Sequence, residues 1–336
     1  FITYSYIFFN DDNKQIFIFC DSTMYTNHIL YLMGIFPTTK NHLQHTNYQI
    51  IYICMNKTIA VLLTVHNRKD KTLKCLEKLY EQNISNEYII DVYLTNDGCT
   101  DGTHEAINTQ YPQVNIILGN GKLFWNRGMR IAWETAVYNK EYEFYLWLND
   151  DTIAYPEMIK LLLNASTKQK DKAIIVGATV DTQTHKKHTY GGRIDNKLVP
   201  LTGKIEKIDS FNGNIVLIPL SVFNILGFND NYFTHSFGDL DYGLRAKKMG
   251  IECYQVGIPV GECDRHENLM TWCSPNVPLK KRWKALTLPT GYRANEVWYF
   301  NKKHYGIMQA MLHVVTTYTR CLFPNLWIKM NKADWR

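Results

Sequence analysis

The stretch YLWLNDDT, residues 145–152, joins a continuous apolar run to a cluster of polar residues. The apolar run predicts a buried strand, and Asn149, Asp150 and Asp151 follow in the loop at its carboxyl end. In an open α/β sheet, ligands bind outside the carboxyl ends of the strands, and hard divalent cations take oxygen ligands there. From these residues alone two interpretations stay open: a metal site, or ordinary turn and helix-capping residues.

Outward from this stretch, short apolar runs alternate with segments of helical spacing, which is typical of βαβ units and a mostly parallel sheet. The pattern predicts an α/β domain. Strands are expected at 58–65, 89–94, 114–118, 144–148 and 173–179, and helices at 70–82, 101–109, 126–139 and 156–165. Beyond residue 180 the alternation becomes irregular, with a hairpin or loop expected at 184–197 and a strand followed by a short helix at 211–228.

We divide the chain into three parts. Residues 55–275 form the α/β domain. Residues 1–54 are expected to be an extension, either translated upstream sequence or a poorly ordered segment. A genuine small N-terminal domain is the alternative, because aromatic and β-branched residues are plentiful there.

The third part, residues 276–336, is basic, partly apolar and expected to be helical. Between Lys280 and Arg336 there are eleven Lys and Arg residues against Glu296 and Asp334, whereas the whole chain carries a net charge of +6. Such a segment suits peripheral attachment to anionic lipid, and equally an ordinary helix pair with a solvated basic face. The expected location is the cytoplasm, at the inner face of the plasma membrane.

Several classes of protein are disfavoured by what the sequence lacks. The eight cysteines show no CxxC pairing, so a zinc site or disulfide framework is not expected and a reducing compartment fits better. No GxxxxGK[ST] loop is present, and no GxGxxG follows the first strand of the α/β domain, which argues against P-loop NTPases and dehydrogenases. Nucleic-acid binding is disfavoured because the positive charge is concentrated at the C-terminal end without a reading module.

Polar residues also follow other expected strands. In TNDGCTDGT, residues 95–103, Asp97 stands where a carboxylate can bind a base or ribose, although Asn-Asp-Gly also forms plain turns. The Gly-rich loop GNGKLFW, residues 119–125, contains Lys122, which can contact phosphate or simply be solvated. Trp125 can belong to this loop or to the core, whereas Trp133, at helical spacing, is expected in the core.

The segment SFGDLDYGLRAKKMG, residues 236–250, supplies the strongest partners for the Asp150 and Asp151 pair. Asp239 and Asp241 are expected to precede a helix that carries Arg245, so that one carboxylate faces the cleft and the other caps the helix. Asp239 can accept a proton from an attacking hydroxyl, and Asp241 can orient a loop or the acceptor.

Six motifs in this order resemble one known family: TVHNR (64–68), NDGCTDGT (96–103), GNGKLFW (119–125), WLNDDT (147–152), FNGNIVLIP (211–219) and FGDLDYGLRAKKMG (237–250). The family is that of the inverting family 2 glycosyltransferases of the GT-A fold, particularly their bacterial rhamnosyltransferase-like branch. The resemblance covers residues 57–266. It implies a Rossmann-like, mostly parallel sheet of the nucleotide-diphospho-sugar transferase type, with a helical C-terminal extension.

The resemblance also implies the reaction. A sugar would pass from a dTDP- or UDP-sugar, with inversion, to a hydroxyl of a glycan or lipid-linked acceptor in cell-surface polysaccharide biosynthesis. Asp239 would be the general base, and Asp241 and Arg245 would orient the acceptor or a loop. Mg²⁺ or Mn²⁺ would be held by Asp151 and by His266, although a lone loop histidine is also commonly structural. Nucleotide-binding residues would be Thr64, His66, Asn67, Arg68, Asp97, Lys122 and Asp150.

Two positions depart from the family pattern: Asn149 stands at the first position of the DxD motif, and Gly238 stands where many relatives carry Glu. Two rival functions stay open beside the transferase. A catalytically inactive sugar-nucleotide-binding scaffold of the same fold would need no base, so Asp239 argues against it. A nucleotidyltransferase would need a glycine-rich and basic triphosphate loop after the first strand, where TVHNR stands instead.

Overall fold

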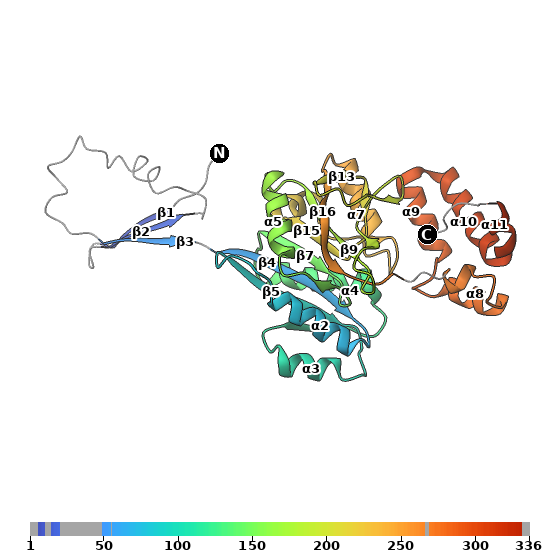
Figure 1. The fold of residues 1–336 in the computed structure, drawn as a ribbon, viewed down its shortest axis with the longest axis horizontal. Coiled ribbons are helices and arrows are strands. Elements are labelled where there is room, and N and C mark those ends of the chain that lie inside the picture. The colour runs from blue at the N-terminus through green and yellow to red at the C-terminus, as the bar shows by residue number, and fades with distance from the viewer. Residues whose placement is uncertain (1–5, 11–14, 21–48, 55, 266–268, 331–336) are drawn as a thin grey trace. The chain divides into compact units, whose positions relative to one another are not determined.

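The computed structural model of the chain describes residues 6–10, 15–20, 49–54, 56–265 and 269–330 (Figure 1). Residues 1–58 with 85–89 form one compact unit, and residues 59–84 with 90–336 form a second. In the first unit, strands β1 (Tyr6–Asn10), β2 (Gln15–Cys20) and β3 (Gln49–Cys54) make a three-stranded sheet, in which β2 pairs antiparallel with β1 and parallel with β3. The boundary at residue 54 stays a prediction.

The central sheet follows the order β13-β16-β9-β15-β7-β4-β5-β6. Strands β4, β7, β9 and β16 run in one direction, and β15 lies antiparallel between β7 and β9. Parallel strands β5 and β6 complete one edge, and antiparallel β13 the other. The bounds are β4 Lys57–Val65, β5 Tyr88–Asn96, β6 Asn115–Leu118, β7 Phe144–Leu148, β9 Ile174–Val180, β13 Glu206–Ile208, β15 Ile215–Pro219 and β16 Cys253–Glu262.

Short strands decorate this sheet. β8 (Ile153–Ala154) pairs with β16, and β10 (His188–Tyr190) pairs with β9. β11 (Gly192–Ile194) pairs with both β12 (Lys197–Leu198) and β14 (Ser210–Phe211) in a separate small sheet. The hairpin expected in the irregular region is therefore confirmed.

Helices alternate with the strands, as the sequence predicts, and four more helices gather at the C-terminal end (Figure 1). The predicted α/β class with a mostly parallel sheet and a helical C-terminal segment is confirmed. In the part of the chain that the structure describes, the helices are α2 Lys69–Tyr80, α3 Thr103–Gln110, α4 Phe124–Asn139, α5 Met158–Lys168, α6 Leu220–Leu226, α7 Gly238–Lys248, α8 Leu279–Thr287, α9 Ala294–Tyr305, α10 Ile307–Leu322 and α11 Pro324–Met330, with a short 3₁₀ turn at Thr271–Cys273.

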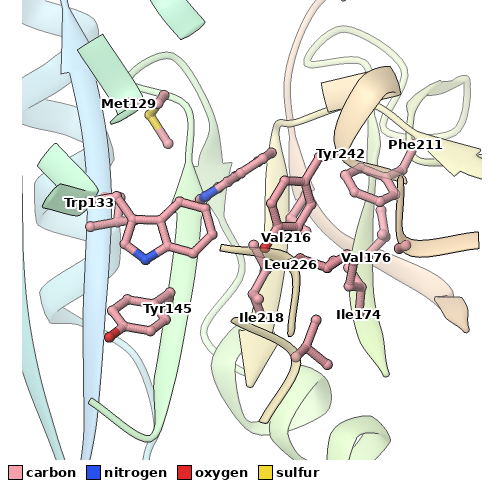
Figure 2. Close-up of a cluster of buried hydrophobic side chains, with 14 of the residues drawn as sticks. Met129, Trp133, Tyr145, Ile174, Val176, Phe211, Val216, Ile218, Leu226 and Tyr242 are labelled. Atoms are coloured by element: carbon pink, nitrogen blue, oxygen red, sulfur yellow. The ribbon is translucent and has the colours of Figure 1, made fainter. Parts of the chain in front are cut away.

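An aromatic core fixes helices α4 and α7 against the sheet. Trp133 on α4 is fully buried, as expected, and its ring lies 5.4 Å from that of Tyr145 on β7 and 5.7 Å from that of Tyr242 on α7. Figure 2 shows Trp133 beside Tyr145, and Tyr242 near Phe211. Aromatic pairs of this kind add roughly 0.5–1.5 kcal/mol each beyond the burial of apolar area. The helix that carries Asp239 is therefore rigidly placed on the sheet.

Helix α7 begins earlier than predicted. It starts at Gly238, so Asp239 and Asp241 lie in its first turn and do not precede it. The reason is local: Phe237 adopts a left-handed φ of 71°, which turns the chain, and the Asp241 amide donates to the Phe237 carbonyl at 2.7 Å. Carboxylates in a first turn are favoured by the helix dipole.

The C-terminal helices pack onto the α/β domain through a second apolar cluster. Phe233 and Phe237, which precede α7, bury themselves against Val297 and Phe300 of α9. The opposite situation holds for α10, where several large apolar side chains remain exposed. Within the described residues, no helix combines the length and the apolar character needed to cross a bilayer.

Candidate active site

The polar segments that follow β4, β5 and β7 meet at the carboxyl edge of the sheet. The Asp97 amide donates to the Val65 carbonyl at 2.9 Å, which aligns the ends of β5 and β4. Arg68, four residues on from the predicted Thr64, reaches Asp150 and Asp151 beyond β7. Three motifs far apart in sequence thus form one site, in the place where open α/β sheets bind ligands.

Asp97 organises the loop after β6. Its side chain is buried, and its two carboxylate oxygens accept hydrogen bonds from the amides of Gly121, Leu123 and Phe124 at 2.8, 2.9 and 2.8 Å. The carboxylate of Asp97 thus already accepts three hydrogen bonds from the protein. Its predicted contact with a base or ribose stays a prediction. Lys122 lies in the same loop with its side chain exposed to solvent, where a phosphate can reach it.

The loop after β4 is held in a defined conformation. Asn67 has a left-handed φ of 52°, and its side-chain oxygen accepts a hydrogen bond from the Thr100 amide at 2.7 Å. A ring nitrogen of His66 lies 2.6 Å from the Asp97 carbonyl. His66 and Asn67 are exposed at the edge of the sheet, whereas Thr64 is buried where α4 passes. Of the predicted nucleotide-binding residues in this loop, Thr64 is thus the one least open to a ligand.

Asp150 and Asp151 form a carboxylate pair bridged by Arg68. One guanidinium nitrogen of Arg68 lies 3.2 Å from Oδ1 of Asp150 and 2.8 Å from Oδ2 of Asp151. Burial raises the pKa of Asp150 to about 7, and the neighbouring charge of Arg68 only partly opposes this shift. The second oxygen of Asp150, Oδ2, is buried without a hydrogen-bond partner.

These residues fit a divalent cation. Burying a carboxylate oxygen without a hydrogen-bond partner costs free energy. A hard divalent cation, which takes carboxylate oxygens as ligands, would provide the missing partner. Among the described residues no group of three or more His, Cys, Asp or Glu side chains could hold a metal. A cation here would therefore take further ligands from water or from a bound phosphate. The predicted ligand His266 lies outside the described residues.

Asp239 lies at the same edge of the sheet, beside the turn that precedes β15. Its Oδ2 accepts a hydrogen bond from the Gly213 amide at 2.9 Å, and the adjacent Asn214 carbonyl accepts one from the Asn149 amide at 3.0 Å. Burial raises the pKa of Asp239, and the hydrogen bonds from the Gly213 and Leu240 amides oppose this shift. A partly buried carboxylate with a raised pKa is suited to proton transfer.

Trp125 is a site residue that the sequence left between loop and core. Its indole nitrogen donates to Oδ1 of Asn149 at 2.7 Å, and its ring covers Gly213, where an added Cβ would lie 2.5 Å from the ring. Trp125 is partly exposed, and Gly213, which its ring covers, also donates to Asp239. Asn149, which stands where the DxD motif has its first Asp, thus accepts a hydrogen bond from Trp125.

Asp241 and Arg245 form a buried charge network with α9. One carboxylate oxygen of Asp241 lies 2.7 Å from Nζ of Lys303 and 2.8 Å from Nε2 of His304, and the other lies 3.0 Å from Nε of Arg245. Arg245 also donates to the carbonyls of Leu226 and Phe228, so the pair orients the loop after α6. The predicted orienting roles of Asp241 and Arg245 stay predictions. Contact with an acceptor stays a prediction, because Asp241 is fully buried.

The absence of a side chain at Gly238 has a local cause. An added Cβ would lie 1.8 Å from Oδ1 of Asn126, which is buried and accepts a hydrogen bond from Asn229. A larger residue at position 238 would displace Asn126, whose amide group also donates to the carbonyls of Asp230 and Phe233. Gly238 therefore stands in place of the expected Glu because Asn126 fills the space that a side chain at position 238 would need.

Comparison with known families gives a match over the central part of the chain. Residues 60–223 match the family model described as Glycosyl transferase family 2. This match supports the predicted family over those residues. The rhamnosyltransferase-like branch stays a prediction.

Curated relatives and solved structures give more distant similarities. The chain is 23% identical over 191 residues to an uncharacterized glycosyltransferase of Rickettsia prowazekii (strain Madrid E), covering 53% of this chain and 56% of that protein. A counterpart from Rickettsia typhi (strain ATCC VR-144 / Wilmington) is also 23% identical, over 194 residues, with the same two shares covered. The chain spans about half the length of these curated relatives.

Among solved structures, TarS 1–349 of S. aureus in complex with UDP is 11% identical with a TM-score of 0.47, covering 83% of this chain and 76% of that one. The mannosyltransferase PcManGT from Pyrobaculum calidifontis, in complex with GDP-Man and Mn²⁺, is 13% identical with a TM-score of 0.46, covering 80% and 88%.

Proposed function

We propose that this protein is an inverting, metal-dependent glycosyltransferase that uses a nucleoside-diphosphate sugar. The observation that carries the proposal is the presence, at one edge of the sheet, of a cation-type carboxylate pair and a separate carboxylate with a raised pKa. A binding scaffold would need the first group and not the second. A nucleotidyltransferase is disfavoured because the loop after β4 carries a single arginine in place of a glycine-rich, basic triphosphate loop.

In this proposal the protein's residues divide the chemistry between two sides of the reacting carbon. Asp239 accepts the proton of the acceptor hydroxyl as that oxygen attacks the anomeric carbon, and the bond to the diphosphate breaks on the opposite side with inversion. Asp150 and Asp151 would hold Mg²⁺ or Mn²⁺, which as a Lewis acid would neutralise charge on the departing diphosphate. His66 and Asn67 in the loop after β4, and Lys122 in the loop after β6, are exposed and are proposed to contact the nucleotide.

The donor class is tested first by binding. The protein is heated with UDP-, dTDP- and GDP-sugars in turn, each with Mn²⁺ or with EDTA, and its melting temperature is recorded. We expect one nucleotide class to raise the melting temperature in Mn²⁺, because a ligand that binds only the folded state stabilises it. dTDP- or UDP-sugars are the proposed class. No shift with any donor would contradict the proposal.

The acceptor is proposed to be a glycan or lipid-linked saccharide in cell-surface polysaccharide synthesis, at the inner face of the plasma membrane. Support comes from α10, where apolar side chains recur on one face: Met308, Met311, Leu312 and Val315 are 84%, 56%, 54% and 61% exposed. On helix α8, which contacts α10, Lys280, Lys281 and Lys284 are exposed. Apolar insertion combined with basic residues suits an anionic bilayer.

The membrane proposal predicts a loss of vesicle binding when the apolar face is charged. The double variant Met308→Glu with Leu312→Glu should co-sediment with phosphatidylglycerol-containing vesicles roughly tenfold more weakly than the parent protein, because buried apolar area and electrostatics both contribute to binding. Gln309→Glu, which adds charge at an exposed polar position of the same helix, is the matched control. Equal sedimentation of all three proteins would contradict the proposal.

A further inference from the structure

Arg68 pairs with both carboxylates that would hold a cation. A single nitrogen of its guanidinium contacts both Asp150 and Asp151, at 3.2 and 2.8 Å. Two carboxylates so close together repel each other, and the arginine neutralises one of their two charges. A cation bound to the same pair, for example through the unpartnered Oδ2 of Asp150, would compete with the guanidinium for this negative charge.

The backbone presents Arg68 to the carboxylates. Asn67, the preceding residue, is fixed by its left-handed φ of 52° and by its hydrogen bond to the Thr100 amide. Arg68 itself is the N-cap residue of α2, and its carbonyl accepts hydrogen bonds from both the amide and the hydroxyl of Thr72. The main chain of Arg68 is therefore anchored, while its side chain is 47% exposed and free to take another position.

Resting on the proposed function, we propose that Arg68 is a built-in counter-ion that holds the carboxylate pair before the cation binds and then passes to the diphosphate of the donor. A planar guanidinium forms paired hydrogen bonds with phosphate oxygens as readily as with carboxylates. Competition between the guanidinium and the cation opposes cation binding, whereas new contacts between Arg68 and the diphosphate favour it. Cation and diphosphate therefore bind cooperatively, each with low affinity alone.

The exchange makes opposite predictions for two ligands. In Arg68→Ala, Mn²⁺ alone should bind roughly tenfold more tightly, because the competing cation is gone, within the usual range of coupling between two sites. In the same variant the nucleoside diphosphate, measured with saturating Mn²⁺, should bind roughly tenfold more weakly, because a charge-assisted contact is lost. A residue that merely supports the fold would weaken both.

The experiment measures free Mn²⁺ by electron paramagnetic resonance during titration of the full chain, first without nucleotide and then with UDP, dTDP or GDP. Lys71→Ala is the control for loss of a nearby positive charge, since Lys71 is an exposed residue on the same helix. We expect Lys71→Ala to change either affinity by less than about threefold, as screened surface charges do. Asp151→Asn verifies that the titrated site is the carboxylate pair.

Each outcome decides the inference. If Arg68→Ala leaves Mn²⁺ affinity unchanged or weakens it, while the parent protein binds Mn²⁺ and nucleotide, Arg68 is not a competing counter-ion and the transferase proposal stands. If neither protein binds Mn²⁺ at millimolar concentration, the inference fails together with the metal-dependent function. Tighter Mn²⁺ binding with weaker diphosphate binding supports the exchange.

Discussion

Asp239→Asn is expected to lower the turnover number for sugar transfer by about 10³-fold, because a positioned general base contributes roughly 10²–10⁴-fold. The asparagine keeps the shape of the side chain and can still accept the hydrogen bond from the Gly213 amide, but it cannot take a proton. Donor affinity should change by less than about twofold, since the loss concerns an interaction made in the transition state. Steady-state kinetics and a donor titration measure the two quantities separately.

The pH profile provides an independent reading of the same residue. Because burial raises the pKa of Asp239, the base becomes protonated, and activity falls, at a pH higher than an ordinary aspartate would give. In Asp239→Asn the contribution of Asp239 to this acid limb should disappear, whereas the titration of Asp150, whose pKa is raised to about 7, should remain. Asp209→Asn is the matched control, since Asp209 is a half-buried carboxylate paired with Lys247, which lies near the C-terminal end of α7. Near-normal turnover of Asp239→Asn would exclude Asp239 as the base.

Asp241→Asn is expected to cost about 3–5 kcal/mol of the free energy of unfolding, the usual effect of removing one partner from a buried ionic network. Asp241 is fully buried, and the change would leave Lys303 and Arg245 without their central counter-charge. Because Lys303 and His304 belong to α9, the loss should loosen the contact between α7 and the C-terminal helices.

Denaturant unfolding measures this cost, with Asp230→Asn as the control. Asp230 also pairs with Lys303, at 2.8 Å, but is more exposed, so its loss should cost about 1 kcal/mol or less. Burial acts to raise the pKa of Asp241, yet the hydrogen bonds from His304 and Lys303 lower it overall. Its stabilising contribution is therefore complete above the pKa of the unfolded chain and is lost as the pH falls through the lower pKa of the folded state. Equal costs for both variants would contradict a buried network.

The periodicity of apolar residues predicted much of the fold, because buried strands appear as continuous apolar runs and amphipathic helices repeat apolar residues about every three to four positions. The apolar run 144–148 coincides with β7, and the helical spacing from Asn126 to Asn139 lies within α4. The start of α7 could not be predicted, because it depends on a left-handed Phe237, an unusual conformation for a bulky residue. No local pattern announces such a turn.

The sequence predicted that the site residues follow the ends of strands. It did not predict which of their side chains contact one another. Arg68 and Asp150 are 82 residues apart in the sequence. Their contact depends on the neighbouring positions of β4 and β7 in the sheet, and on the hydrogen bond from the Thr100 amide that holds Asn67 in place. The role of Asp241 depends on α9, which the sequence assigned to a separate segment. Trp125 stood out in the sequence as an aromatic residue in a Gly-rich loop. That pattern is typical of both a binding loop and the core, so it did not predict that Trp125 lies at the site.

The most direct test of the central claim is the release of nucleoside diphosphate from the donor that shifts the melting temperature, measured with Mn²⁺ and with EDTA. The account predicts slow release by water and faster release with a saccharide acceptor, both lost in EDTA and both reduced by about 10³-fold in Asp239→Asn. A folded protein that binds the donor yet releases no diphosphate, with any acceptor tested, would contradict the transferase and leave a sugar-nucleotide-binding scaffold.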